Sequence, residues 1–399
     1  MLNKQYLKII PLVLLLTFFG CSDDPSSLGV GLLGPDNVDV MELNSLTDSL
    51  NQESHYVKKI ITLGTAQKFL LGSANGITAH ALIRFNISLT ADEKSLLAVD
   101  SLEVVSAIVS FYPVYQYGDS TAFFDFKAYQ IKNDWNPQLI KVDSLSGLDI
   151  DSSVSRIKDG TLEKNDSLIT FSLKDDFALQ WLKAEAAIDT NNNKEYGLYI
   201  KPETGTNKIL GFQAFSSTSD YQARLTYIMK KKGEADPDTV VFYVLSDTHI
   251  LLGEFQQISN NNILVQGGIG YKSRIHFDLS KLPAHAVINS ATLILNRDSV
   301  ETLLGNGYTN ALSAFYITDT TATDFEYDNS FSTTLSPESN QYSGSVISIV
   351  NKMIKNKNSG FGITIFNQVE GVERIVFHGS SDADLTLRPK LIIKYSINK

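Results

Sequence analysis

Apolar and polar residues alternate along two stretches of the chain that resemble each other. Residues 81–88 are ALIRFNIS and residues 273–280 are SRIHFDLS. In both stretches the apolar side chains fall on one face and the polar ones on the other, with the period of two that is typical of a half-buried strand. The pattern predicts two equivalent strands, and with them an internal repeat.

Further segments match in the same order along the two halves. The matched pairs are 105–111 with 289–295, 196–200 with 361–365, and 223–229 with 389–395. Short helices are expected before the second pair, at 177–183 and 346–354. The stretch 90–101 has no counterpart in the second half and is interpreted as a solvated loop.

Short strands, turn-rich joints and one short helix per copy predict an all-β chain of two tandem antiparallel β-sandwiches of jelly-roll type. A parallel α/β fold is excluded because long helices do not alternate with the strands. The expected divisions are a signal peptide at 1–20, a lipidated tether at 21–44, a first, diverged sandwich at 45–229, a charged linker at 230–238 and a second sandwich at 239–399.

The N-terminus has the form of a secretory signal. Lys4 and Lys8 precede an apolar run at 9–19, which is too short for a spanning helix of about 20 residues. Gly20 and Cys21 close this run and resemble the lipobox of bacterial lipoproteins, so Cys21 is the expected lipid attachment site and the lipid bilayer an expected partner. Because Cys21 is the one cysteine in the sequence, an intramolecular disulfide is excluded.

Ser22, Asp23 and Asp24 follow the cysteine. An acidic run at this place resembles the export signal that sends lipoproteins of the Bacteroidota to the outer face of the outer membrane. The expected localisation is therefore the outer membrane, lipid-anchored and exposed at the cell surface.

The charge balance argues against nucleic acid as a partner. The sequence has 34 basic and 44 acidic residues, and removing the expected signal leaves 32 against 44. A phosphate-binding surface needs clustered Lys and Arg, whereas the one basic run, 230–232, lies in the expected linker. With 43% hydrophobic and 10% aromatic residues, the chain can form packed cores.

The second half carries motifs of a known family. Residues 274–283, 286–295 and 388–393 resemble the "RxxxFDLSxLP", "IxSAxLxL" and "RPxLxV" segments of the DNRLRE-domain family. The first half resembles it more distantly, with Ala223 in place of the closing proline. The resemblance implies a β-sandwich related to carbohydrate-binding modules, and hence binding of extracellular or cell-wall polysaccharide.

Catalytic motifs are not visible in the sequence. The six histidines show no metal-ligand spacing, and no Gly-x-Ser-x-Gly elbow is present. Residues 189–195 alternate oxygen side chains as calcium loops do, but Lys194 stands where an EF-hand needs glycine, so an Asn-rich turn is expected. No cofactor is expected, and a structural calcium ion elsewhere stays open. The protein is expected not to be an enzyme, although paired carboxylates that meet only in space remain an alternative.

Exposed aromatic rings flanked by polar side chains are what sugar binding requires. Tyr115 and Tyr117 lie at alternate positions of one expected strand and could form a small platform, or could instead cover the sandwich edge. Trp135 could stack on a sugar or close the core, and Arg274 opens the family's strand motif. Three hypotheses follow: a glycan-binding surface lipoprotein, which we favour, a structural or protein-interaction component of the cell envelope, and an enzyme.

Overall fold

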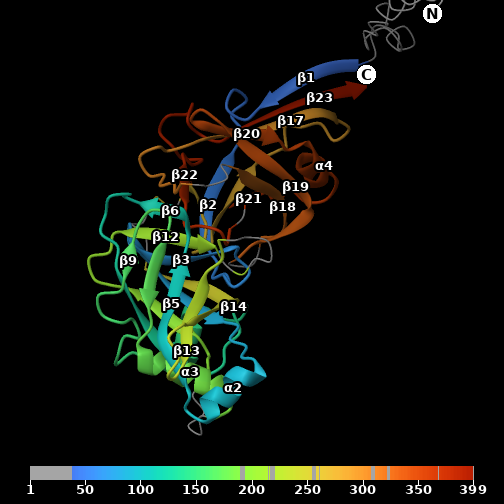
Figure 1. Ribbon diagram of the computed structural model, residues 1–399. Helices are drawn as coiled ribbons and strands as arrows, with labels where there is room; N and C mark the ends of the chain where they lie inside the picture. Colours follow the sequence, from blue (N-terminus) through green and yellow to red (C-terminus); the bar gives the residue numbers. More distant parts are fainter. Residues whose placement is uncertain are drawn as a thin grey trace, which may run out of the picture.

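The computed structural model describes residues 38–188, 194–213, 215, 221–253, 258–259, 261–306, 311–320, 324–366 and 368–398. The all-β prediction is confirmed: antiparallel sheets form two sandwiches, sandwich 1 in the lower half of Figure 1 and sandwich 2 in the upper half. The helices among the described residues are α2 (Ala91–Ala98), α3 (Asp175–Glu185), α4 (Ile347–Lys355) and the 3-10 helix η2 (Val142–Gly147). None of them is long and apolar enough to cross a membrane.

Sandwich 1 has two sheets that share the long strand β14 (Asp238–Gly253). Its β5 sheet consists of the first part of β14, β13 (Arg224–Lys231), β5 (Leu102–Phe111), β10 (Ile169–Ser172) and β9 (Glu163–Lys164). Its β4 sheet consists of β6 (Pro113–Gly118), β12 (Lys208–Gln213), β3 (Lys68–Ala74), β4 (Ile77–Phe85), the second part of β14, β11 (Leu198–Pro202), β7 (Phe126–Ile131) and β8 (Ile150–Asp151).

Sandwich 2 repeats the order of strands within the sheets, but the strand that its two sheets share is β19 (Glu326–Glu338), at the edge opposite to that of β14. Its β17 sheet consists of β1 (Val38–Asn44), β23 (Lys390–Asn398), β17 (Val287–Asn296), β20 (Gln341–Ser345) and the end of β19. Its β16 sheet consists of the start of β19, β18 (Leu312–Asp319), β21 (Phe361–Ile365), β16 (Tyr271–Phe277), β2 (Gln52–Lys58), β15 (Ile263–Gln266) and β22 (Arg374–Phe377).

Each sandwich encloses its own apolar core. In sandwich 1, Phe69 of the β4 sheet meets Phe111 of the β5 sheet edge to face, with ring centroids 5.4 Å apart. In sandwich 2, Tyr342 and Phe377 make the same kind of contact between the sheets at 5.3 Å. Burial of these inward faces is the main stabilising term of both sandwiches.

The predicted repeat is visible in the backbone. In the first copy Val105 is an extra residue between Val104 and Ser106, which pair with adjacent residues of β13. In the second copy Asn289 is the extra residue, at the matching position before the shared Ser-Ala, where β17 pairs with β23. The β-bulge lies at the same place in the β5–β13 pair and in the β17–β23 pair. This supports the match of 105–111 with 289–295 and of 223–229 with 389–395.

One matched pair was misaligned by two residues. Gly197 has φ +105° and lies against the carbonyl of Ile83, and Gly360 has φ +91° and lies against the carbonyl of Ile275. Gly197 therefore corresponds to Gly360, not to Gly362 as the sequence match had it. Because side chains alternate with a period of two, a shift of two keeps every apolar residue on its face and escapes a pattern match.

The predicted domain boundaries differ from the structure, because the first strand of each copy completes the other sandwich. β1 pairs with β23 and β2 pairs with β16, so residues 38–58 belong to sandwich 2, and Figure 1 shows blue β1 beside red β23. β14 pairs with β13 and β4 and belongs to sandwich 1. Alternation identifies a strand and its buried face but not its partner.

Two other expectations, one about a linker and one about a loop, were also wrong. The segment expected to be the linker connects the two strands of a hairpin within sandwich 1, since Met229 pairs with Asp238 and β13 runs on to Lys231. The segment expected to be a solvated loop forms α2, whose first turn is closed by a capping box between Thr90 and Glu93. The predicted helices α3 and α4 are confirmed.

The two sandwiches meet along an apolar seam. Leu70 and Tyr115 of sandwich 1 are buried in one cluster with Ile269 and Val372 of sandwich 2. At its rim the Lys68 ammonium lies 3.2 Å from the Glu370 carboxylate. The seam fixes one sandwich against the other through packed side chains.

The role of β1 can be tested with paired substitutions. Leu43→Ala removes a side chain buried in the core of sandwich 2 and should lower the free energy of unfolding by about 2–5 kcal/mol. Val40→Ala, on the same strand but 69% exposed, should change it by less than about 0.5 kcal/mol. Urea denaturation measures both. Equal, small effects would show that β1 is a tether in solution.

Candidate binding site

The predicted tyrosine platform lies in the seam between the sandwiches. Tyr115 and Tyr117 do point the same way from β6, but they are only 3% and 0% exposed. The Tyr115 hydroxyl accepts a hydrogen bond from the Val372 backbone N–H at 3.3 Å. The prediction that these rings stack on a glycan was wrong, because sandwich 2 covers them. Sequence alternation shows that the two rings share the outward face of β6, but it does not show what packs against that face.

Trp135 and Arg274 are also held within the fold. Trp135 is 8% exposed, and its Nε1 donates to the Tyr196 carbonyl at 2.6 Å, so this ring closes a satellite core. Arg274 is half-buried on β16 and donates from Nε to the Ser359 carbonyl at 3.1 Å. Burial lowers the pKa of Arg274. Neither residue lines the pocket described below, and the structure does not bring the four candidates together.

Some predicted features lie outside the described residues. They are the signal peptide, the lipid attachment site Cys21, the export residues Ser22, Asp23 and Asp24, and the core of the Asn-rich turn at 189–193. Within the described ranges, no group of three or more His, Cys, Asp or Glu side chains is placed to hold a metal ion.

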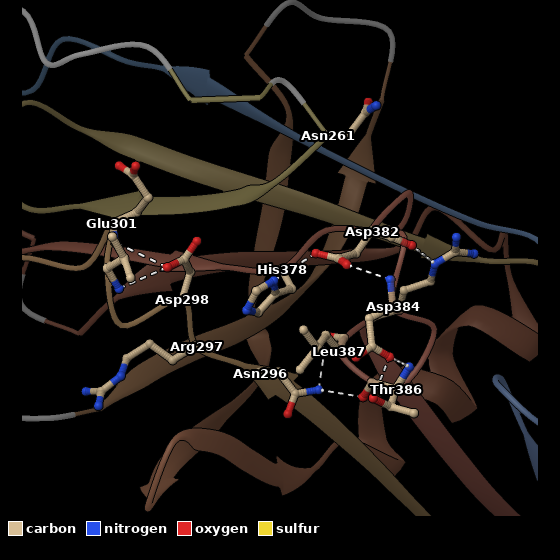
Figure 2. Close-up of polar contacts among 12 residues, drawn as sticks. Asn261, Asn296, Arg297, Asp298, Glu301, His378, Asp382, Asp384, Thr386 and Leu387 are labelled. Atoms are coloured by element: carbon tan, nitrogen blue, oxygen red, sulfur yellow. Dashed lines mark hydrogen bonds and ion pairs between the residues drawn. The ribbon is translucent and has the colours of Figure 1, made fainter.

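A polar cluster closes sandwich 2 before its last strand (Figure 2). His378 Nδ1 lies 2.8 Å from the Asp382 carboxylate, and the other Asp382 oxygen accepts from the Asp384 N–H at 2.9 Å. Asn296 donates to the carbonyls of Thr386 and Leu387 at 3.2 and 3.0 Å. These bonds tie the loop to β17. His378 thus has a partner that the sequence search did not find, four residues further along.

Two carboxylates converge on Arg84 of sandwich 1. Arg84 lies 2.8 Å from an Asp134 oxygen and 3.7 Å from a Glu195 oxygen. Glu195 is buried, which raises its pKa to about 8. Because the guanidinium stands between the two acids, they do not face each other across open space as the paired acids of a glycoside hydrolase would.

An open pocket of about 520 Å³ lies at the lateral edge of sandwich 1, between β6 of one sheet and the β9–β10 turn of the other. Its apolar wall is formed by Pro113, Val114, Phe124, Ile169 and Leu210, with Phe123 at the rim and 56% exposed. This volume falls within the range of small-molecule sites.

Polar side chains ring this pocket. Lys164 comes from β9, Asn165 and Asp166 from the β9–β10 turn, Gln116 from β6, and Lys208 from β12. Asn306 comes from sandwich 2. Its backbone N–H donates across to the Gln116 carbonyl of sandwich 1 at 2.8 Å. Lys164 lies 5.5 Å from the centre of the Phe123 ring. The pocket therefore offers one aromatic face together with amide, carboxylate and ammonium groups.

The tyrosine-rich stretch that the sequence analysis singled out contributes to the pocket lining. Residues 113–116 line it, Tyr115 among them although this residue is only 3% exposed. Phe123 was not among the predicted residues. The pair Phe123-Phe124 carries no signal that tells its rings apart, since Phe123 is 56% exposed and Phe124 only 5%. Asp166 was also not predicted. It is far from β6 in sequence, and the β9–β10 turn lies beside β6 because the edges of the two sheets stack on each other.

No family model matches the chain, and no curated protein or solved structure is significantly similar to it.

His249 on β14 is a buried base beside the seam. It is 1% exposed, neither ring nitrogen has a hydrogen-bond partner among the described residues, and burial lowers its pKa to about 3. It borders a cavity of about 270 Å³ between the sandwiches. The folded protein therefore holds the neutral imidazole.

This burial predicts loss of stability in acid. In the unfolded chain His249 is protonated below about pH 6.5, whereas in the folded protein it stays neutral down to about pH 3. The free energy of unfolding therefore falls as the pH drops from about 6.5 to about 3. His249→Leu should remove about 2–4 kcal/mol of that loss. Urea midpoints between pH 7 and 4 measure it. The exposed control His285→Leu should keep the wild-type pH profile, and an unchanged profile in His249→Leu would contradict the assignment.

Proposed function

We propose that this protein is a non-catalytic lipoprotein of the outer-membrane surface that binds polysaccharide in the pocket of sandwich 1. The observation that carries the proposal is the open pocket at the sandwich edge, with the exposed ring of Phe123 and a rim of amide and carboxylate groups. Pyranose rings have an apolar face that stacks on aromatic rings and hydroxyls that hydrogen-bond to such groups.

The pocket suits a polymer better than an isolated small molecule. It is open to solvent and not an enclosed cavity, so a sugar unit within a longer chain can reach it. Gln116 on β6 and Asp166 in the β9–β10 turn both line the pocket and can contact different hydroxyls of a sugar. The resemblance of the second copy to the DNRLRE-domain family supports the same class of ligand.

The proposed location follows from the N-terminal sequence. The apolar run, Cys21 and the acidic residues after it support a lipid anchor on the outer face of the outer membrane. Extracellular and cell-wall polysaccharides are met at that surface. The described fold begins at Val38, a short segment after the proposed anchor.

A second function is favoured by one observation. β1 forms the outer edge of the β17 sheet, with Val40 and Met41 69% and 45% exposed. An exposed strand edge can accept a strand from another protein. A structural or protein-interaction role in the envelope is therefore the alternative, and it predicts no saturable glycan binding.

Calorimetry on the mature chain with Cys21→Ser, titrated with neutral, uronic-acid and sulfated oligosaccharides, tests the proposal. We expect saturable binding to at least one class. Phe123→Ala should weaken it by about tenfold or more because the stacking surface is lost, and Asp166→Ala by a similar factor because a charged acceptor is lost.

Phe366→Ala is the matched control, since Phe366 is 46% exposed but belongs to sandwich 2. It should bind as the wild type does. Silence of the wild-type protein toward all three classes would refute glycan binding and favour the envelope role.

A further inference from the structure

Three tyrosines and one arginine lie near one another on the outer face of the β5 sheet. The Arg224 guanidinium lies 5.3 Å from the centre of the Tyr112 ring and bonds to the Tyr112 hydroxyl. Tyr221 meets Tyr112 edge to face with centroids 5.4 Å apart. Tyr243 is the partner of Arg224 across the β13–β14 ladder. Tyr221 and Tyr243 are 61% and 50% exposed, so the cluster is open to ligands.

Arg224 has no carboxylate within ion-pair distance among the described residues. The other cations on this sheet face are paired: Lys230 lies 3.5 Å from Glu103, and Lys232 lies 2.7 Å from Asp100. Those pairs stand at the far end of β13, roughly 20 Å from Arg224 at the rise of a strand. This distance is more than the Debye length of about 8 Å at physiological salt. The carboxylates of Glu103 and Asp100 therefore do little to offset the charge of the Arg224 guanidinium.

The second copy shows that the fold does not require these rings. From the shared bulge and the register of the closing strands, Tyr112 corresponds to Asn296, Tyr221 to Leu387 and Arg224 to Lys390. Figure 2 shows that Asn296 bonds the Leu387 backbone directly, where Tyr112 and Tyr221 make a ring contact. A loop-closing contact thus exists in both copies. Sandwich 1 forms it with aromatic rings, beside a guanidinium that has no carboxylate partner in the part of the chain that the structure describes.

The cluster adjoins the pocket of the proposed function. Tyr112 is the connecting residue between β5 and β6, and the next residue, Pro113, lines the pocket. The chain crosses from one sheet to the other at this point, so Tyr112 is the direct neighbour in sequence of a residue that lines the pocket.

We propose that Tyr112, Tyr221, Tyr243 and Arg224 form a subsite for a negatively charged sugar residue, so that the polysaccharide bound in the pocket is an acidic one. This inference rests on the proposed function. The rings offer faces for the C–H side of the sugar, and the guanidinium offers a planar pair of donors for a carboxylate or a sulfate ester. Uronic acids and sulfated sugars share this chemistry.

The test compares matched neutral, uronic-acid and sulfated oligosaccharides on the mature chain with Cys21→Ser. The wild-type protein should bind one of the acidic sets at least tenfold more tightly than the neutral set. Arg224→Gln should abolish this preference and leave the affinity for the neutral set unchanged. Arg224→Lys should keep part of it, because lysine retains the charge without the planar fork. Which acidic set loses affinity identifies carboxylate or sulfate as the group bound.

Lys158→Gln is the control, since Lys158 is an exposed cation of the same sandwich paired with Asp175; it should keep the wild-type preference. If Arg224→Gln unfolds, as thermal melting would show, Tyr221→Ser at a 61% exposed position is the second variant, with a loss of about fivefold or more expected for acidic ligands.

The outcomes separate the two proposals. Equal affinity of the wild type for neutral and acidic sets, or a preference that survives Arg224→Gln, overturns the subsite while the pocket stands. Loss of all binding in Phe123→Ala together with loss of preference in Arg224→Gln supports both. No binding of any set by the wild type overturns both.

Discussion

The exchange of first strands between the two copies is the constraint on which the rest of the structure depends. Without β2, β16 would lose a partner along seven residue pairs, and without β14, both β4 and β13 would lose one. Neither copy is therefore a separable domain in sequence order. Because the chain passes between the sandwiches after β2 and again after β14, the two bodies are joined twice. The apolar seam around Tyr115 forms where these crossings hold them together.

Sequence patterns predicted the elements that depend on local alternation. The strands at 81–88 and 273–280, the closing strands and the helices near Trp181 and Met353 all follow from the period of buried positions. Pairing partners do not follow from it, because every half-buried strand offers the same pattern of backbone donors and acceptors on its two edges. The exchange of β1 and β2 and the two-residue shift at Gly197 are both of this kind. Thr90 and Glu93 did carry a helix signal that composition obscured.

The candidate site was less predictable than the fold. Alternation showed correctly that Tyr115 and Tyr117 share a face, but whether a face is solvated depends on what packs against it, and here that is Val372 of the other sandwich. Phe123, Asp166 and Arg224 come from three separate strand ends and loops. Their juxtaposition arises from sheet stacking, which a linear pattern does not encode. The internal repeat provides a comparison within the same chain. Sandwich 2 has the same backbone arrangement and lacks the rings of Tyr112 and Tyr221.

The pairing of the first described strand with the last also sets the order in which the chain can fold. Ser45 and Leu391, which exchange a hydrogen bond, are 346 positions apart. Sandwich 1 can close once β14 has been synthesised, whereas sandwich 2 must wait for β23. Until then β1 and β2 are unpaired strands with apolar faces, so slow, non-local closure and a need for protection from aggregation follow from the topology itself.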